Sequence, residues 1–422
     1  MVEPVGAHQH GHSGWQAPRH IERMLWVAIG AWAVLALIGL ALLWPGSSRG
    51  SAVDFEVDSR VTGTVDNITI VPCTGTAVED LIDCRLVSVR LQEGPQSGLD
   101  VTFEQAVTSG PIRVPEVGDG VVLSEFAAGD GTFSYNFADY ERTGSMLVLG
   151  VFFVAAVLLL GRWRGLGALV GLGVSIVVLV AFMLPALLDG SNPIVVAIVG
   201  ASIIAFASLY LAHGVTAATN VALLSTLLAL ALTGILAWIF IGATTFTGLT
   251  DESSFYLEAL GVSIDPRGLL LAGVVIGALG VLDDVTVTQV SAVAELRALQ
   301  PNASPAVLYR SALTIGRDHI SSTVNTLFLA YAGAALPLLL VFRVVQAPIG
   351  DVAMREQVAV EIVRTLVGSM GLVAAVPIAT GLATLVLTRS DGAGHGADHG
   401  AGHVHQVGPV RSDGPVQDEM PS

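Results

Sequence analysis

Long uninterrupted apolar runs dominate the chain and set the expected fold. A helix that crosses a bilayer needs roughly 20 apolar residues. The first such run is 24–44, and further runs follow after a polar segment. We therefore predict a polytopic α-helical membrane protein with about eight transmembrane helices. The later runs are 145–161, 166–187, 194–212, 218–241, 268–294, 321–342 and 364–387.

The segment 49–142 has a different pattern. Apolar and polar residues alternate with period two in short runs such as 61–65, 86–91 and 120–123, and turn residues separate them. This alternation is typical of half-buried β-strands. We predict a small all-β domain here, a barrel or a sandwich, with the OB fold as one option.

Both cysteines of the chain, Cys73 and Cys84, lie in this β segment. If the domain lies outside the cytoplasmic membrane, oxidising conditions favour a disulfide between them. Two buried free thiols are the alternative, and a metal site made from two cysteines without a nearby His is the weakest option.

The distribution of Arg predicts the orientation. Arg19 and Arg23 precede the first apolar run, and cytoplasmic segments of membrane proteins are enriched in basic residues. We therefore expect a retained first helix rather than a cleaved signal peptide. The expected location is a bacterial cytoplasmic membrane, with the β domain outside and both termini in the cytoplasm. Most later Arg residues agree with this orientation, but four break the pattern: Arg267, Arg343, Arg355 and Arg364.

The two ends of the chain, 1–23 and 389–422, are polar and have no periodic apolar face, so we expect them to be disordered. Four histidines of the second end could chelate a transition metal weakly. A solvated tail is the simpler interpretation. These histidines are His395, His399, His403 and His405.

Two polar blocks interrupt the last apolar runs. Ionisable groups in or beside hydrocarbon are costly unless they face protein, water or an ion, which makes both blocks candidate functional sites. The first block contains Asp283, Asp284, Thr288, Gln289, Ser291 and Glu295. The second contains Arg317, Asp318, His319, Ser322, Asn325 and Thr326.

Helical spacing arranges each block as a stripe. Asp284, Thr288, Ser291 and Glu295 recur at i, i+4, i+7 and i+11, and the second stripe consists of Asp318, Ser322 and Asn325. Because the two helices are consecutive and antiparallel, we expect the stripes to lie at similar depth and to face each other across a shared cleft.

Three interpretations of these stripes remain open. In the first, Asp283 or Asp284 alternates between a protonated and an ionised form, or binds a cation, because burial and a neighbouring like charge disfavour ionisation. In the second, Asp284 pairs with Arg317 and the other groups hydrogen-bond between helices. In the third, the helix ends near Leu282 and the polar groups are solvated. A lone His such as His319 is more often structural than a proton relay.

These same residues carry a family resemblance. The segments GALGVLDDVTVTQVSA (277–292) and GRDHISSTVNTLFLAY (316–331) resemble signature segments of the YibE/F-like family of bacterial multi-pass membrane proteins. The resemblance implies a helical membrane domain over about 145–388. It also implies that Asp284 is the shared acid, because many members have a Met-Asp pair where this chain has Asp283 and Asp284.

The leading functional hypothesis is a secondary transporter or ion-coupled permease that acts on a small solute or ion, with Asp284 as the coupling acid. The alternative is a membrane scaffold or sensor whose β domain binds a partner or an envelope component. No nucleophile–base set indicates an enzyme, and we expect no cofactor. A net charge of −16 argues against nucleic acid as a partner. The lipid bilayer is the expected environment, and association with a second copy or another membrane protein stays open.

Overall fold

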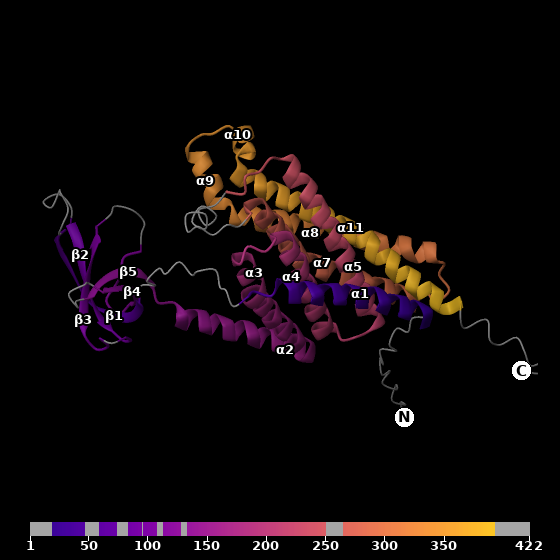
Figure 1. Cartoon of the computed structure of the whole chain (residues 1–422), viewed down its shortest axis with the longest axis horizontal. Helices are drawn as coiled ribbons and strands as arrows, with labels where there is room; N and C mark the ends of the chain where they lie inside the picture. Colours follow the sequence, from indigo (N-terminus) through magenta and orange to yellow (C-terminus); the bar gives the residue numbers. More distant parts are fainter. Residues whose placement is uncertain are drawn as a thin grey trace, which may run out of the picture.

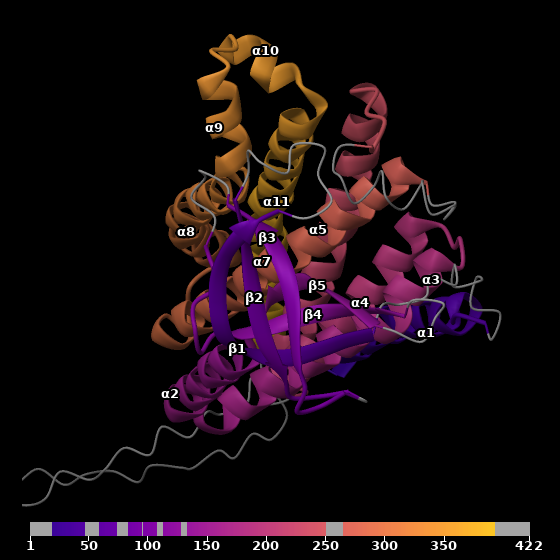
Figure 2. The same ribbon diagram turned by 90° about the vertical axis from the view of Figure 1, so that its left-hand side faces the viewer.

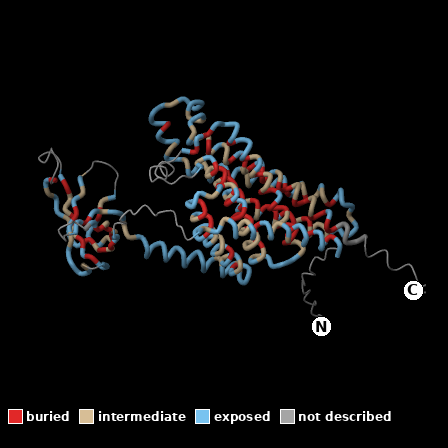
Figure 3. Tube along the Cα trace, in the orientation of Figure 1, coloured by how far each residue is buried: buried red, intermediate tan, exposed pale blue. Residues whose placement is uncertain are grey.

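A computed structural model describes residues 19–46, 59–73, 83–94, 96–107, 113–127, 133–249 and 265–392. A β domain lies at one end of the molecule, and α2 leads from it to a helix bundle (Figure 1). Buried residues run through the middle of the bundle, whereas its outer surface is exposed (Figure 3). An apolar exposed surface of this kind is what a lipid environment requires.

Five antiparallel strands form the β domain, in the spatial order β3-β2-β1-β4-β5. Figure 2 shows the sheet end-on as a strongly curved half-barrel. The edge strands β3 and β5 approach each other, and the rings of Phe103 and Phe137 lie 5.6 Å apart. A complete OB-type barrel stays a prediction. The strands are β1 (Ser59–Pro72), β2 (Asp83–Leu91), β3 (Asp100–Ala106), β4 (Gly120–Ala127) and β5 (Phe133–Tyr140).

The predicted period-two pattern explains this sheet. Val61 and Val65 of β1 and Val87 and Val89 of β2 all point into one core, in which each is at most 2% exposed. Strand β5 was missing from the sequence-based prediction because its core-facing positions are the aromatic residues of a short segment. The proposed strand near 53–57 lies outside the described residues.

The helix bundle contains all the remaining elements. Prolines at the first turn and side-chain caps begin several helices, as at Asn192, Thr216, Asp265 and Ser304. The elements are α1 (Arg19–Leu43), α2 (Thr143–Val177), the π-helical turn η1 (Val178–Met183), α3 (Leu184–Leu188), α4 (Pro193–His213), α5 (Ala217–Ala243), α7 (Pro266–Leu299), α8 (Pro305–Ala334), α9 (Leu336–Val344), α10 (Ile349–Met354) and α11 (Glu356–Gly392).

Six helical stretches of the described chain are long and apolar enough to cross a membrane, and the pair α8–α9, bent by 60°, would make a seventh. The two predicted runs 145–161 and 166–187 form one continuous stretch, Thr143–Leu188. At 1.5 Å per residue it is about 69 Å long, twice the thickness of a bilayer core. Its helical backbone is interrupted at Arg162, where φ is 50° and ψ is −129°.

Several predicted boundaries were wrong. Helix α1 begins at Arg19, inside the segment 1–23 that we expected to be disordered, and α11 continues to Gly392, past the predicted end at 388. Helix α8 begins at Pro305 rather than near 321. In each case the helix extends through polar residues beyond the apolar run, because a helix can continue into the aqueous phase after its hydrophobic part ends.

One end of the bundle is rich in arginine. Arg19, Arg23, Arg297 and Arg310 lie on the helix termini that meet there. A buried cluster ties these termini together, with Leu25 of α1, Val221 of α5, Val293 of α7, Leu308 of α8 and Val386 of α11.

The opposite end of the bundle is held by a carboxylate. Glu356 at the start of α11 accepts hydrogen bonds from the backbone N–H groups of Thr247 and Gly248, at 2.6 and 2.8 Å. A side chain at Gly248, where φ is +81°, would collide with Pro266. This clamp fixes the starts of α7 and α11 relative to the end of α5.

Candidate functional site

Helix α7 has one buried and one exposed face. Leu279, Leu282, Val285 and Val293 belong to its buried face and pack against the bundle core. Glycine and polar residues occupy the exposed side at helical spacing, and we call this stripe the polar face of α7. It consists of Gly277, Gly280, Asp284, Thr288, Ser291 and Glu295.

The helix does not end near Leu282, so the third interpretation of the polar stripes is wrong. Helix α7 continues without a break to Leu299 and carries both aspartates within it. Asp283 and Asp284 therefore occupy adjacent positions about 100° apart around the axis.

Asp283 faces α4. The Ser208 hydroxyl donates a hydrogen bond of 2.7 Å to Asp283 Oδ2. The other carboxylate oxygen, Oδ1, is buried and has no hydrogen-bond partner. A buried carboxylate oxygen without a donor is costly, so a proton or a cation on this group would stabilise it.

Asp284 lies on the exposed polar face. His213, at the end of α4, feels the charges of both Asp284 and Arg164, so these three groups form one electrostatic neighbourhood. No ion pair joins Asp284 to Arg317 in the part of the chain that the structure describes. The second interpretation, in which this pair holds the helices together, is therefore not what the structure contains.

Two further polar residues of α7 point inward and connect helices. The Thr286 and Thr226 hydroxyls lie 2.6 Å apart and join α7 to α5. Gln289 is 3% exposed, and its Nε2 donates to the Ala312 carbonyl and to the Thr380 hydroxyl, both at 2.8 Å. These residues fix the position of α7 among α5, α8 and α11.

The two stripes lie at similar depth, as predicted. Gln289 reaches Ala312, and a side-chain carbon at Gly277 would lie 3.2 Å from the Tyr331 hydroxyl, which sets the antiparallel register of α7 and α8. This register places Asp284 about level with residues 318–322.

The stripes do not, however, face each other. Leu313, Val324 and Leu327 turn one side of α8 to the core, and the second stripe lies on the other side. No hydrogen bond or ion pair joins the two stripes in the described ranges. His319 is only partly buried, but its Nε2 is enclosed without a partner. The exposed members on α8 are Arg317, Asp318, Ser322, Asn325 and Thr326.

Sequence reasoning missed a charged group on α11. Arg364 forms an ion pair of 2.6 Å with Glu361, and both side chains are about three-quarters buried. The Arg364 guanidinium also lies 3.7 Å from where a side-chain carbon at Gly273 of α7 would be. The available signal was that Arg364 broke the distribution of basic residues, and its pairing in the bundle explains that exception.

The β domain contains the predicted disulfide. Cys73 and Cys84 are bonded, with their Cα atoms 4.9 Å apart at one end of the β1–β2 pair. The four candidate histidines of the C-terminal tail lie outside the described residues. Among the described residues, no group of three or more His, Cys, Asp or Glu side chains could hold a metal ion.

Comparison with known proteins places this site in a family. The description of YibE/F-like proteins matches residues 149–389, more than half of the chain. The chain belongs to the YibE/F-like family. This confirms the resemblance seen in the two signature segments. The YibE/F-like match begins after the β domain and includes α4, α7, α8 and α11 with both polar stripes. No curated protein and no solved structure matches the chain.

Proposed function

We propose that this integral membrane protein is a secondary transporter or ion-coupled permease that moves a small solute or ion along the polar face of α7. The observation that carries the proposal is the enclosed, unpartnered oxygen of Asp283 beside the exposed Asp284. Polar and ionisable groups within membrane helices mark ion or proton pathways more often than structural sites.

The two aspartates have different proposed roles. Asp283 binds the coupling proton or cation, because its Oδ1 lacks a donor and its Oδ2 has only Ser208. Asp284 exchanges that ion with the polar face and with His213. Family resemblance alone favoured Asp284, and the geometry adds Asp283. This activity is transport and not enzymatic catalysis.

The proposed topology has eight crossings. The 46-residue stretch Thr143–Leu188 supplies two of them, joined at the break at Arg162, and the bent pair α8–α9 supplies another. The arginine-rich end of the bundle lies in the cytoplasm, in accord with the usual distribution of basic residues. The β domain then lies outside, where its disulfide is stable.

Cysteine labelling tests this topology directly. Both native cysteines are bonded, so an introduced cysteine is the only free thiol. Asp100→Cys in β3 should react with an impermeant reagent in intact cells, and Gln300→Cys, at the end of α7, should react only after permeabilisation. Labelling of both from the same side would overturn the topology.

Accessibility of the polar face tests the pathway. Thr288→Cys and Ser291→Cys should react with water-soluble thiol reagents, whereas Leu160→Cys, equally exposed but on an apolar stretch of α2, should not because lipid covers it. Equal protection of all three would contradict a water-filled pathway and favour the scaffold.

Solute-dependent proton movement tests the coupling. Proteoliposomes with an entrapped pH dye are exposed to a panel of ions and small solutes. Any solute-dependent signal should disappear in Asp283→Asn and persist in Asp318→Asn, the matched change on α8. An undiminished signal in both Asp283→Asn and Asp284→Asn would refute the mechanism.

One observation favours the sensor alternative. The backbone N–H of Glu141 still pairs with the Gly120 carbonyl at 2.9 Å, and the Glu141 carboxylate accepts the backbone N–H of Thr143 at 2.7 Å. Strand β5 therefore passes almost directly into α2. A partner bound to the β domain would act on this helix, and protection of the polar face in the labelling experiment would support that function instead.

A further inference from the structure

The first turns of α1 form a second polar feature, remote from the acids of α7. Ile21, Leu25 and Ile29 turn one side of α1 toward the bundle, where each is at most 6% exposed. Arg19, Arg23, Glu22 and Trp26 belong to the side that the bundle does not cover.

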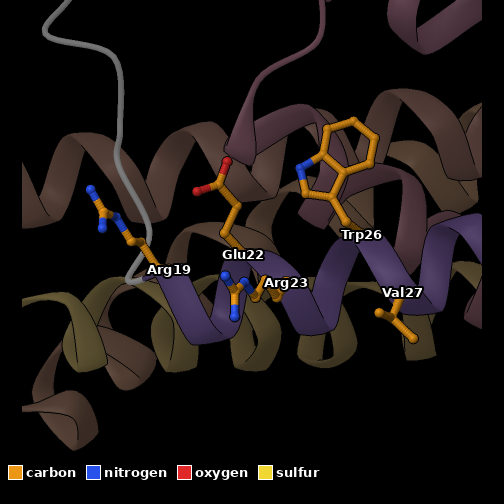
Figure 4. A pocket seen from close by; sticks show the side chains of 5 residues that line it. All are labelled: Arg19, Glu22, Arg23, Trp26 and Val27. Carbon is orange, nitrogen blue, oxygen red and sulfur yellow. The ribbon is translucent and has the colours of Figure 1, made fainter.

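An open hollow of about 430 Å³ lies on this side, lined by Arg19, Glu22, Arg23, Trp26 and Val27. Figure 4 shows the five side chains projecting from successive turns of α1. Arg19, Arg23 and Trp26 follow the i, i+4, i+7 spacing of one helix face. Neither Arg has an ion-pair or hydrogen-bond partner among the residues that the structure describes.

The chemistry of the hollow fits a phosphodiester group at a membrane surface. Guanidinium groups bind phosphate oxygens through pairs of N–H donors. Tryptophan prefers the level of the lipid headgroups. Glu22 reduces the net charge of the hollow to +1 and offers an acceptor to a headgroup hydroxyl, which favours one negative charge over several.

The surface below the hollow fits acyl chains. Further along α1, Val27, Leu35 and Leu42 are 71, 66 and 80% exposed, so an apolar surface continues from the basic end toward the opposite end of the helix. A soluble phosphate compound would leave this surface unused, whereas a phospholipid would cover it.

We propose that the hollow binds a monoanionic glycerophospholipid, with its phosphodiester between Arg19 and Arg23 and its acyl chains along the exposed side of α1. The site anchors the start of α1 in one leaflet. The proposal depends only on the charge and placement of α1, and not on the proposed transport activity.

Native mass spectrometry of the detergent-solubilised full chain tests the site, with phosphatidylglycerol as the probe and phosphatidylcholine as the neutral reference. The double variant Arg19→Gln/Arg23→Gln should bind phosphatidylglycerol about 30-fold more weakly, because each Arg near an anionic lipid contributes about 1 kcal/mol and 1.4 kcal/mol is tenfold. The matched control Arg310→Gln, exposed at the same end of the bundle, should bind as the wild type does.

Further arms separate the alternatives. Unchanged phosphatidylglycerol binding in the double variant, or an equal loss in Arg310→Gln, would refute the site. Inorganic phosphate that displaces the lipid at millimolar concentration would show a soluble-anion site and overturn the lipid assignment. If the double variant does not fold, Arg23→Lys provides the test, because it keeps the charge but loses bidentate binding and should weaken phosphatidylglycerol binding selectively.

Discussion

The β domain and the helix bundle each hold an acid largely away from solvent, and each acid accepts a hydrogen bond from one hydroxyl group. In the β domain, the Tyr135 hydroxyl donates to Glu125 Oε1 at 2.8 Å, and Gln96 Oε1 lies 2.9 Å from the same hydroxyl. In the bundle, Ser208 donates to Asp283 at 2.7 Å.

The difference lies in the second carboxylate oxygen. Oδ1 of Asp283 is buried without a partner, whereas neither oxygen of Glu125 is among the buried unpartnered atoms of the described chain. A structural acid is satisfied by its surroundings. An acid with an unsatisfied oxygen has a place for a proton or an ion, and the comparison therefore assigns a structural role to Glu125 and a functional role to Asp283.

The largest effect on stability is expected from removing the partner of the structural acid. Tyr135→Phe leaves the buried Glu125 without its donor and should destabilise the β domain by about 2 kcal/mol, since hydrogen bonds to charged groups contribute roughly 1.5–3 kcal/mol. Hydrogen exchange of the β4 and β5 peptides in the full chain measures this local opening.

Asp283→Asn serves as the counterpart of that variant. It replaces a carboxyl by a neutral amide of the same shape and should leave exchange in both domains close to wild type while solute-dependent proton movement is lost. Strong destabilisation by Asp283→Asn, together with a silent Tyr135→Phe, would reverse the assignment of roles.

Sequence patterns predicted the broad architecture because apolar run length and period-two alternation depend on local residues alone. They predicted that Asp284, Thr288, Ser291 and Glu295 share a face, because helical periodicity fixes relative angles. They did not predict which way each face points. That depends on tertiary packing, such as Gln289 reaching Ala312 and Thr380.

The partners across helices were also beyond prediction. Ser208 is separated from Asp283 by 75 positions, and nothing in its local sequence marks it. The pairing of Arg364 with Glu361 has normal helical spacing, but only the fold shows that the pair lies beside Gly273 of α7.

A smaller effect is expected from alkaline pH, and it should be confined to the β domain. Burial, followed by the hydrogen bond and charge of Glu125, raises the pKa of Tyr135 to about 12 from its ordinary value of 10. Since the unfolded chain loses this proton more readily, the stabilisation is complete below pH 10 and is lost as the pH rises from 10 to 12.

Hydrogen exchange of the β4 and β5 peptides across this pH range, corrected for the intrinsic rate, should show progressive opening in wild type. The Tyr135→Phe variant should lack this dependence, because it has no phenol at this position. An identical alkaline transition in both proteins would show that another group is responsible.

The smallest effect is expected from Ser208→Ala, and its sign sharpens the comparison most. If Asp283 is usually neutral or carries an ion, losing one neutral hydrogen bond should cost only about 0.5–1.5 kcal/mol. If Asp283 were a permanently charged structural acid like Glu125, the same change would leave a charge with no donor and should cost about as much as Tyr135→Phe. Thermal unfolding followed by tryptophan fluorescence measures the bundle specifically, because all six Trp residues lie outside the β segment. A double-mutant cycle with Asp283→Asn then isolates the pair. A coupling energy near 3 kcal/mol would assign Asp283 to the structure, and one below about 1 kcal/mol would agree with an acid that exchanges its proton.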